Sequence, residues 1–459
     1  MQKAVAAIFD VGKTNKKLFL IDEQYNIVYE RSARFVETKD EDGEPCENLA
    51  SLRSSVFDSL HQVLELKQYD IRAINFSTYG ASFVYLDENG TPLTPLYNYL
   101  KDYPEELKKE FYAKYGGEGT VSVETASPVL GSLNSGMQLY RLKKERPEIF
   151  AKVKYALHLP QYLSYLISGK AVADITSIGC HTLLWDFARN DYHKWVSKEG
   201  ILEKLGTFTP ADSSSKIEFE GHEIKVGVGL HDSSAALIPY LANFANPFVL
   251  LSTGTWCISL NPFNQEILTE EELKQDCLCY MHFKGKAVKA SRIFAGYEHE
   301  VQLKRIAEHF SRAAYLFKHL KFNASMILKL ANKIPENQWP QDVFSEKSLF
   351  GNRDLNLFQT AEEAYHQLIF DLVKQQIYSL KLVLNEGVRR IFVDGGFGRN
   401  EIYMHILAIS IPDIEVYASS VSQATAIGTA LAINDAWNDN PAPSDIIQLK
   451  YYSAIQRSM

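Results

Sequence analysis

Residues 226–260 read VGVGLHDSSAALIPYLANFANPFVLLSTGTWCISL, and this stretch decides how the rest of the chain is interpreted. An acidic residue, Asp232, stands directly before a helical pattern at 233–241. Pro247 then breaks the chain before an apolar strand at 248–251, a small polar turn at 252–255 and a second apolar run. A carboxylate at a helix start, followed closely by a strand–turn–strand that could hold phosphate, suits phosphoryl transfer.

The N-terminus repeats the second part of this arrangement. Residues 4–9 form a buried-type strand, 10–17 a polar turn and 18–21 a returning strand. Each half of the chain opens on such a hairpin and continues into alternating strand and helix patterns, which include expected helices at 156–167 and 314–320. The sequence therefore predicts an α/β fold of two duplicated domains, 1–243 and 244–459, with a cleft between them.

Composition excludes several classes of protein. The net charge of -8 argues against a nucleic-acid or anionic-membrane partner, because both require concentrated positive charge. The apolar run before Asp10 is too short for a signal peptide, and no later run is long enough to span a bilayer. Five cysteines without a regular framework predict free thiols in a reducing cytoplasm.

The first polar turn, Asp10-Val-Gly-Lys-Thr-Asn-Lys-Lys17, has the residues of a phosphate site. Gly12 permits a tight turn whose N–H groups could converge on phosphate oxygens, while Lys13 or Lys17 adds charge and Thr14 a hydroxyl. Asp10 would face a metal ion that bridges those phosphates. Taken alone, a plain hairpin with a solvated lysine-rich turn explains the segment as well, and the P-loop pattern is absent.

Three further segments carry candidate chemistry. Asp232 is either an ordinary helix cap or the general base that accepts a proton from a substrate hydroxyl, with His231 beside it. Ser252-Thr-Gly-Thr-Trp256 is a second turn suited to phosphate, in which Thr255 could contact the terminal group and Trp256 is expected in the core. Asp394-Gly-Gly-Phe-Gly-Arg-Asn400 is a glycine-rich turn that lets the backbone approach an adenosine.

The order of these motifs resembles that of the FGGY family of carbohydrate kinases, and the resemblance spans nearly the whole chain. It is carried by Asp10-x-Gly-x-Thr-x-x-Lys17, Leu230-His-Asp232, Ser252-Thr-Gly-Thr-Trp256, Gly395-Gly-x-Gly-x-Asn400 and Ala426-Ile-Gly-Thr-Ala430. Thr78-Tyr-Gly-Ala-Ser-Phe83 is similar to the early sugar-contacting segment of the family. The His-Asp and Gly-Thr-Trp motifs are most similar to the rhamnulokinase and L-fuculokinase branch. Lys13 departs from the pattern, because many members have a small residue there.

This resemblance implies two ribonuclease H-like (actin-like ATPase) domains that close on Mg-ATP and a ketose, and often a homodimer. Asp232 would be the proton acceptor, and Asp10 and Asp232 would face Mg²⁺. The phosphate and nucleotide contacts would be Gly12, Lys13, Thr14, Asn15, Lys17, Thr255, Gly396, Gly398 and Asn400. The sugar contacts would be Gly80, His231, Asp232 and Ser233.

The implied activity is transfer of the γ-phosphoryl group of ATP to a hydroxyl of L-rhamnulose or L-fuculose. Two alternatives stay open. One is a kinase for another polyol or ketose, such as xylulose, ribulose or glycerol. The other is a non-catalytic actin-like protein that uses ATP only to change shape, although such relatives are not expected to carry Leu-His-Asp between the two hairpins.

Overall fold

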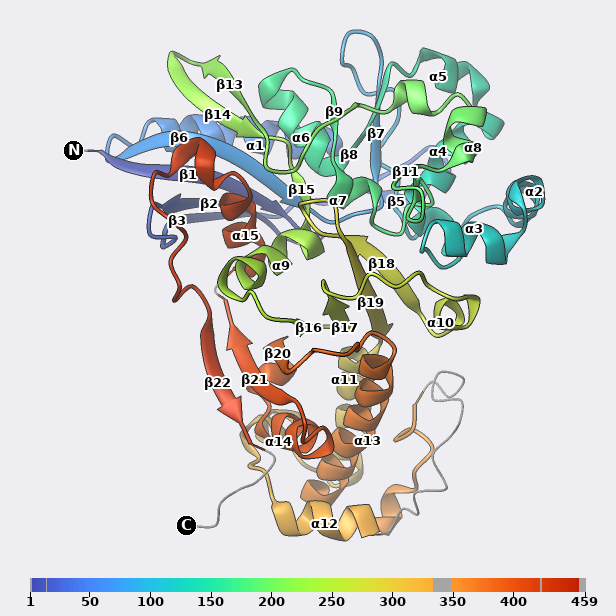
Figure 1. The fold of residues 1–459 in the computed structure, drawn as a ribbon, viewed down its shortest axis with the longest axis vertical. Coiled ribbons are helices and arrows are strands. Elements are labelled where there is room, and N and C mark those ends of the chain that lie inside the picture. Colours follow the sequence, from blue (N-terminus) through green and yellow to red (C-terminus); the bar gives the residue numbers. More distant parts are fainter. Residues whose placement is uncertain (1, 14, 333–347, 422, 454–459) are drawn as a thin grey trace.

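A computed structural model describes residues 2–13, 15–332, 348–421 and 423–453, which form two mixed sheets of seven strands each (Figure 1). The first sheet has the strand order β13-β14-β6-β1-β2-β3, with β15 also beside β6. Its strands are β1 (Lys3–Val11), β2 (Lys16–Asp22), β3 (Ile27–Ala33), β6 (Tyr69–Thr78), β13 (Ser214–Phe219), β14 (His222–Gly227) and β15 (Leu230–His231).

The second sheet has the order β18-β19-β17-β16-β20-β21-β22. Its strands are β16 (Phe248–Thr253), β17 (Cys257–Asn261), β18 (Cys277–Met281), β19 (Ala287–Ile293), β20 (Arg390–Gly395), β21 (Glu415–Ser420) and β22 (Gln448–Tyr452). Short strand pairs complete the set: β4 (Thr38–Lys39) with β5 (Pro45–Cys46), β7 (Phe83–Leu86) with β8 (Tyr155–His158), β9 (Val172–Ala173) with β12 (Thr207–Phe208), and β10 (Trp185–Asp186) with β11 (Asp191–Tyr192).

The two sheets repeat one pairing pattern. Strand β1 pairs antiparallel with β2 and parallel with β6, and β16 pairs in the same way with β17 and β20. Helices connect these strands and cover the sheets. They are α1 (Leu49–Leu64), α2 (Glu105–Tyr115), α3 (Glu118–Glu124), α4 (Ser135–Glu145), α5 (Pro147–Lys152), α6 (Leu159–Ser168), α7 (Ile175–Ile178), α8 (Lys194–Lys198), α9 (Asp232–Asn243), α10 (Glu270–Lys274), α11 (Ala295–His309), α12 (Ala324–Asn332), α13 (Ala361–Lys381), α14 (Glu401–Ser410), α15 (Ala424–Ala432) and α16 (Asn434–Trp437). The prediction of a duplicated α/β fold is confirmed.

Two helices join the halves. In Figure 1, α9 and α15 lie between the two sheets. One hydrophobic core runs through them: Ile8 and Phe19 of the first sheet, Leu237 of α9, Ile427 of α15 and Phe392 of the second sheet all belong to it. The division predicted at 243 and 244 falls between α9 and β16, but α15, which follows it in the chain, packs against the N-terminal sheet.

The crossing of these helices depends on one glycine. A Cβ atom at Gly428 would lie 1.8 Å from the backbone oxygen of Ala235. Because that neighbour is backbone, no rotamer change relieves the clash, and we expect Gly428→Ala to lower the free energy of unfolding by roughly 1–3 kcal/mol. Thermal unfolding measures this loss.

Gly119→Ala in α3 is the matched control. It is also a helical glycine, but the nearest atoms belong to the flexible carboxylate of Glu270. Since alanine favours a helix more than glycine does, this variant should be at least as stable as the wild type. Equal stability of both variants would contradict the tight crossing.

Several elements differ from the sequence-based expectations. The first turn is shorter than 10–17, because Asp10 and Lys17 pair with each other inside the β1–β2 ladder. The apolar run at 156–167 is not one helix: it begins as β8 and becomes α6, where Pro160 stands in the first turn. The helix expected at 314–320 is the 3-10 helix η3 (Ala314–His319). Apolar periodicity alone does not separate such short elements.

Among the described residues, no helix combines the length and apolar character needed to cross a bilayer. All five cysteines are buried and free of disulfides, as their spacing predicted. The expectation that Trp256 belongs to the core is wrong, because this residue is 43% exposed.

Candidate active site

Asp10 and Asp232 flank the carboxyl end of β6. Asp10 lies opposite Ser77 in the β1–β6 register, and His231, which precedes Asp232, lies opposite Thr78 in the β15–β6 register. The Ser77 hydroxyl donates a hydrogen bond to Asp10 Oδ1 at 3.3 Å. Burial, together with the charge of Asp232, raises the pKa of Asp10 to about 6. The charges of the two predicted carboxylates therefore interact, at the end of the sheet where β6 terminates.

Asp232 is the first residue of α9, and its side chain is 34% exposed. It is not the capping residue, since His231 occupies that position. Its Oδ1 accepts a hydrogen bond from the Ser233 N–H at 2.6 Å and lies 3.2 Å from His231 Nε2. These contacts fix the carboxylate at the protein surface, where a substrate hydroxyl could reach it.

His231 is buried between the halves. Its ring stacks on Tyr280 of β18 at 5.8 Å, and its backbone N–H donates to Thr176 Oγ1. Burial lowers its pKa despite the neighbouring Asp232, so the ring is neutral, with Nε2 3.4 Å from Cys180 Sγ and 3.2 Å from the carboxylate. A Cβ atom at position 80 would lie only 2.8 Å from the His231 ring. Gly80 has no side chain, and its absence makes room for this ring. These predicted sugar-side residues adjoin Asp232.

The predicted phosphate residues of the first turn are mostly engaged with other groups. The Gly12 N–H donates to the Asn15 carbonyl at 2.9 Å, which closes the turn, and Asn15 Oδ1 accepts from Arg34. Lys13 Nζ lies 3.3 Å from Glu37, and Lys17 Nζ lies 2.9 Å from Glu30. Thr14 lies outside the described residues. Both lysines are partly exposed, so they could turn toward an anion.

The carboxylates at this edge fit a hard divalent cation. Magnesium is usually held by one or two carboxylates together with substrate phosphates and water. Within the described part of the chain no cluster of three or more His, Cys, Asp or Glu side chains is placed to hold a metal. The pair Asp10 and Asp232 supplies two carboxylates whose mutual repulsion a cation would relieve.

The second hairpin and the glycine-rich turn lie side by side in the C-terminal half. Thr253 joins them: its hydroxyl donates to the Asp394 carbonyl at 2.5 Å and accepts from the Phe397 N–H at 3.0 Å. The Gly396 N–H donates to the Thr253 carbonyl at 2.9 Å. Two motifs about 140 residues apart in the sequence thus form one surface.

This surface lines a pocket of about 900 Å³. Thr255, Gly396 and Asn400, the residues that the resemblance assigns to the nucleotide, line it together with residues from α11 and α13. Gly398 does not line the pocket. A Cβ atom at this position would lie 2.6 Å from the backbone oxygen of Val393, so glycine here allows the backbone to pack closely. The size suits a nucleotide-sized ligand.

The polar wall of this pocket had no local signal in the sequence. Tyr365 of α13 accepts a hydrogen bond from Asn400 Nδ2 at 2.9 Å and lies 3.1 Å from His299 Nε2. Burial lowers the pKa of His299 to about 4, so this ring is neutral. Tyr365 and His299 looked like ordinary helix residues, because only the packing of α11 against α13 brings them to Asn400. These side chains form a wall of neutral hydrogen-bond donors and acceptors.

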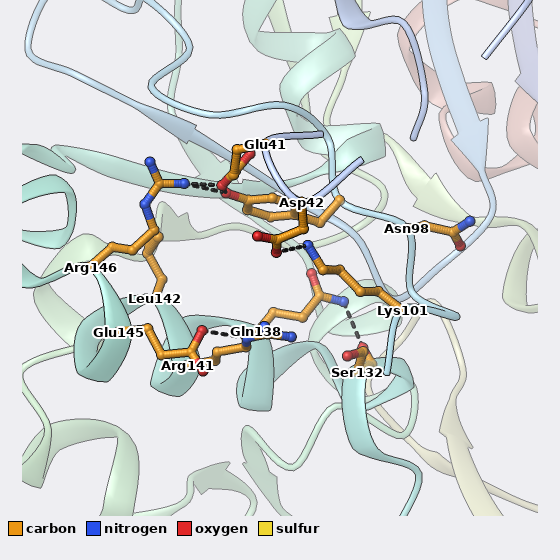
Figure 2. A pocket seen from close by; sticks show the side chains of 11 residues that line it. Glu41, Asp42, Asn98, Lys101, Ser132, Gln138, Arg141, Leu142, Glu145 and Arg146 are labelled. Carbon is orange, nitrogen blue, oxygen red and sulfur yellow. Dashed lines mark hydrogen bonds and ion pairs between the residues drawn. The ribbon is translucent and has the colours of Figure 1, made fainter. Parts of the chain in front are cut away.

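A second pocket lies in the N-terminal half (Figure 2). Its charged side chains are paired with one another: Lys101 with Asp42 at 2.6 Å, Arg146 with Glu41, and Arg141 with Glu145 at 2.7 Å. Gln138 donates to the carbonyls of Ala81 and Ser132. It therefore holds the segment after Gly80 against α4.

Comparison with known proteins agrees with this architecture. The chain matches the N-terminal domain of the FGGY family of carbohydrate kinases over residues 5–219 and the carbohydrate kinase FGGY C-terminal domain over residues 245–441. It is 24% identical over 452 residues to a rhamnulokinase of Halalkalibacterium halodurans, covering 92% of this chain and 89% of the relative.

Solved structures show the same fold. A carbohydrate kinase from Novosphingobium aromaticivorans superposes with a TM-score of 0.80 at 21% identity, covering 99% of this chain and 95% of that one. A xylulose kinase from Rhodospirillum rubrum gives 0.77 at 15% identity, covering 98% and 94%. The two family domains together cover most of the chain. The protein belongs to the FGGY family of carbohydrate kinases, has the actin-like ATPase fold and is an ATP-dependent sugar kinase.

Proposed function

We propose that the protein transfers the γ-phosphoryl group of ATP to a hydroxyl of a ketose, L-rhamnulose or L-fuculose, with Asp232 as general base. The observation that carries this proposal is the pair of carboxylates at the end of β6. One of them is partly buried and anchored by Ser77, and the other is accessible at the start of α9. In such a pair the buried carboxylate can serve the metal alone, while the accessible one can also accept the proton of a substrate hydroxyl.

In the proposed reaction, Asp232 accepts the proton of the attacking sugar hydroxyl. His231 Nε2 lies 3.2 Å from Oδ1 of Asp232 and packs beside the carboxylate, while the Ser233 N–H donates to the same oxygen. No described residue makes a hydrogen bond with the second carboxylate oxygen, which would meet the sugar hydroxyl. General bases in this role contribute about 10²–10⁴-fold to the rate.

The nucleotide would occupy the C-terminal pocket. Thr255 would meet its phosphates, and Gly396, Asn400 and Tyr365 would face its nucleoside end. Lys13 of the first turn and Lys17 of β2 would approach the phosphates from the other half. Asp10 and Asp232 would hold Mg²⁺, which neutralises phosphate charge when it is bound.

The sugar is the part of the proposal that rests on a relative. The rhamnulokinase of H. halodurans supports L-rhamnulose, while the fold is shared with a xylulose kinase. Tyr99 is a candidate sugar contact that the motifs did not reveal: its ring lies 5.9 Å from that of Tyr79, next to Gly80, and burial together with the charge of Asp232 raises its pKa. A cytoplasmic location, supported by the free cysteines, and a homodimer stay predictions.

A panel of ketoses and polyols with Mg-ATP tests this function. We expect L-rhamnulose or L-fuculose to be phosphorylated with a kcat/KM at least tenfold above xylulose, ribulose and glycerol, as measured by coupled ADP release and by mass spectrometry of the product. Preference for xylulose or glycerol would keep the kinase and refute the substrate. No stimulation of ATP turnover by any compound of the panel would contradict the proposal as a whole.

A further inference from the structure

Behind the first turn lies a buried ion pair, Lys16 with Glu47. Lys16 Nζ lies 3.0 Å from Glu47 Oε1 and donates to Oε2 at 3.1 Å. The exposed fractions of the two side chains are only 7% and 5%. Moving two charged groups out of water costs free energy, so burial of this pair carries a substantial desolvation penalty.

Each member of the pair also holds a second group. Lys16 Nζ donates to the backbone carbonyl of Lys13 at 2.9 Å, which lies in the predicted phosphate turn. Glu47 Oε2 accepts a hydrogen bond from the Tyr79 hydroxyl at 3.3 Å. Tyr79 directly precedes Gly80, which packs against His231. The pair thus connects the phosphate turn to the sugar-side segment.

Glu47 reaches a third segment through its backbone. It forms an isolated antiparallel bridge with Leu96, a few residues before Tyr99. The rings of Tyr79 and Tyr99 lie 5.9 Å apart, and Lys13 Nζ lies over both of them at 5.7 and 5.9 Å. Three segments that are distant in the sequence therefore meet around one carboxylate.

We propose that Lys16 and Glu47 are positioning residues: they fix the phosphate turn relative to the sugar-side segment, so that both substrates meet at Asp232. This inference rests on the proposed function, which places phosphate at the turn and sugar at Gly80. A role confined to folding is the alternative. The two roles differ in what happens when the pair is replaced by apolar side chains of similar size.

The test compares Lys16→Met with the double variant Lys16→Met/Glu47→Leu. The single variant leaves a buried carboxylate without its cation and should lower the melting temperature. The double variant removes both charges and should regain at least half of that loss. It still leaves the Lys13 carbonyl and the Tyr79 hydroxyl without partners, so we expect Mg-ATP affinity, measured by calorimetry without sugar, to stay at least tenfold weaker than in the wild type.

Glu199 provides a matched control. It is a buried carboxylate that accepts from Lys143 at 2.6 Å, from Lys114 at 2.5 Å and from the hydroxyl of Tyr115, so it resembles the Lys–Glu–Tyr arrangement with more exposed lysines. It lies beside α2 and α8, which Figure 1 shows on the opposite side of the N-terminal half from β1–β3. Lys143→Met/Glu199→Leu should leave Mg-ATP affinity within twofold of the wild type.

The outcomes separate the inference from the function. A double variant of recovered stability that binds Mg-ATP within twofold of the wild type would overturn the positioning role. If the wild type binds Mg-ATP but phosphorylates no sugar, the proposed function fails, while the affinity comparison still decides the role of the pair. A wild-type protein that binds no Mg-ATP would overturn both.

Discussion

Asp232→Asn lowers the rate of sugar phosphorylation by roughly 10²–10⁴-fold and leaves ATP binding within a few-fold of the wild type. The amide keeps the shape of the carboxylate, and its oxygen still accepts from the Ser233 N–H. It cannot accept the proton of the attacking hydroxyl. Steady-state kcat and KM with the preferred ketose, together with calorimetric affinity for Mg-ATP, measure the two quantities separately.

Asp435→Asn is the control for this prediction. Asp435 is an exposed carboxylate in the first turn of α16, so the chemical change and its place on a helix are similar. This variant should keep wild-type turnover. Near-normal turnover of Asp232→Asn would dismiss Asp232 as the base. Loss of Mg-ATP binding in parallel with turnover would leave Asp232 only its proposed metal-side role and remove its role as base.

The sequence predicted the fold well where a local pattern was sufficient. Runs of apolar residues interrupted by glycine predicted both hairpins and the glycine-rich turn. The helical pattern after Asp232 predicted α9. Each of these elements is present. The crossing of α9 and α15 could not be predicted, because the contact of Gly428 with Ala235 joins residues that are far apart in the chain.

The candidate site shows the same limit. Asp10, Asp232 and Thr255 stand in motifs, so the sequence pointed to them. Lys16 looked like one more solvated lysine of the turn, yet it is buried because Glu47, 31 residues away, pairs with it. Tyr365 likewise gains its partners only from tertiary packing. Functional residues that depend on distant neighbours carry no local signal.

Ionisation of Asp10 lowers the free energy of unfolding. Its carboxyl group is largely buried and faces the charge of Asp232, while Ser77 and Lys17 offset these effects only in part, so its pKa rises from 3.8 to about 6. Between these two values the folded protein binds a proton that the unfolded chain has released. The free energy of unfolding therefore falls as pH rises from about 4 to 6, and ionised Asp10 costs up to about 3 kcal/mol at neutral pH.

Asp10→Asn should therefore raise the melting temperature at pH 7.5 while it abolishes sugar phosphorylation, because the amide needs no charge stabilisation and holds a cation poorly. Its stability advantage should shrink as pH falls toward 4, where Asp10 of the wild type is itself protonated. Thermal unfolding of both proteins from pH 4 to 8, without metal or nucleotide, measures the difference.

Asp22, on the same hairpin, supplies a control of opposite sign. Burial opposes its ionisation, but hydrogen bonds from Lys3 and Asn26 outweigh this effect and hold its pKa below the ordinary value. The ionised group therefore stabilises the folded protein above pH 4, and that contribution is lost as pH falls. Asp22→Asn should be less stable than the wild type at pH 7.5. If Asp10→Asn were also less stable than the wild type at pH 7.5, the prediction would be wrong. Ionised Asp10 would then stabilise the hairpin as Asp22 does.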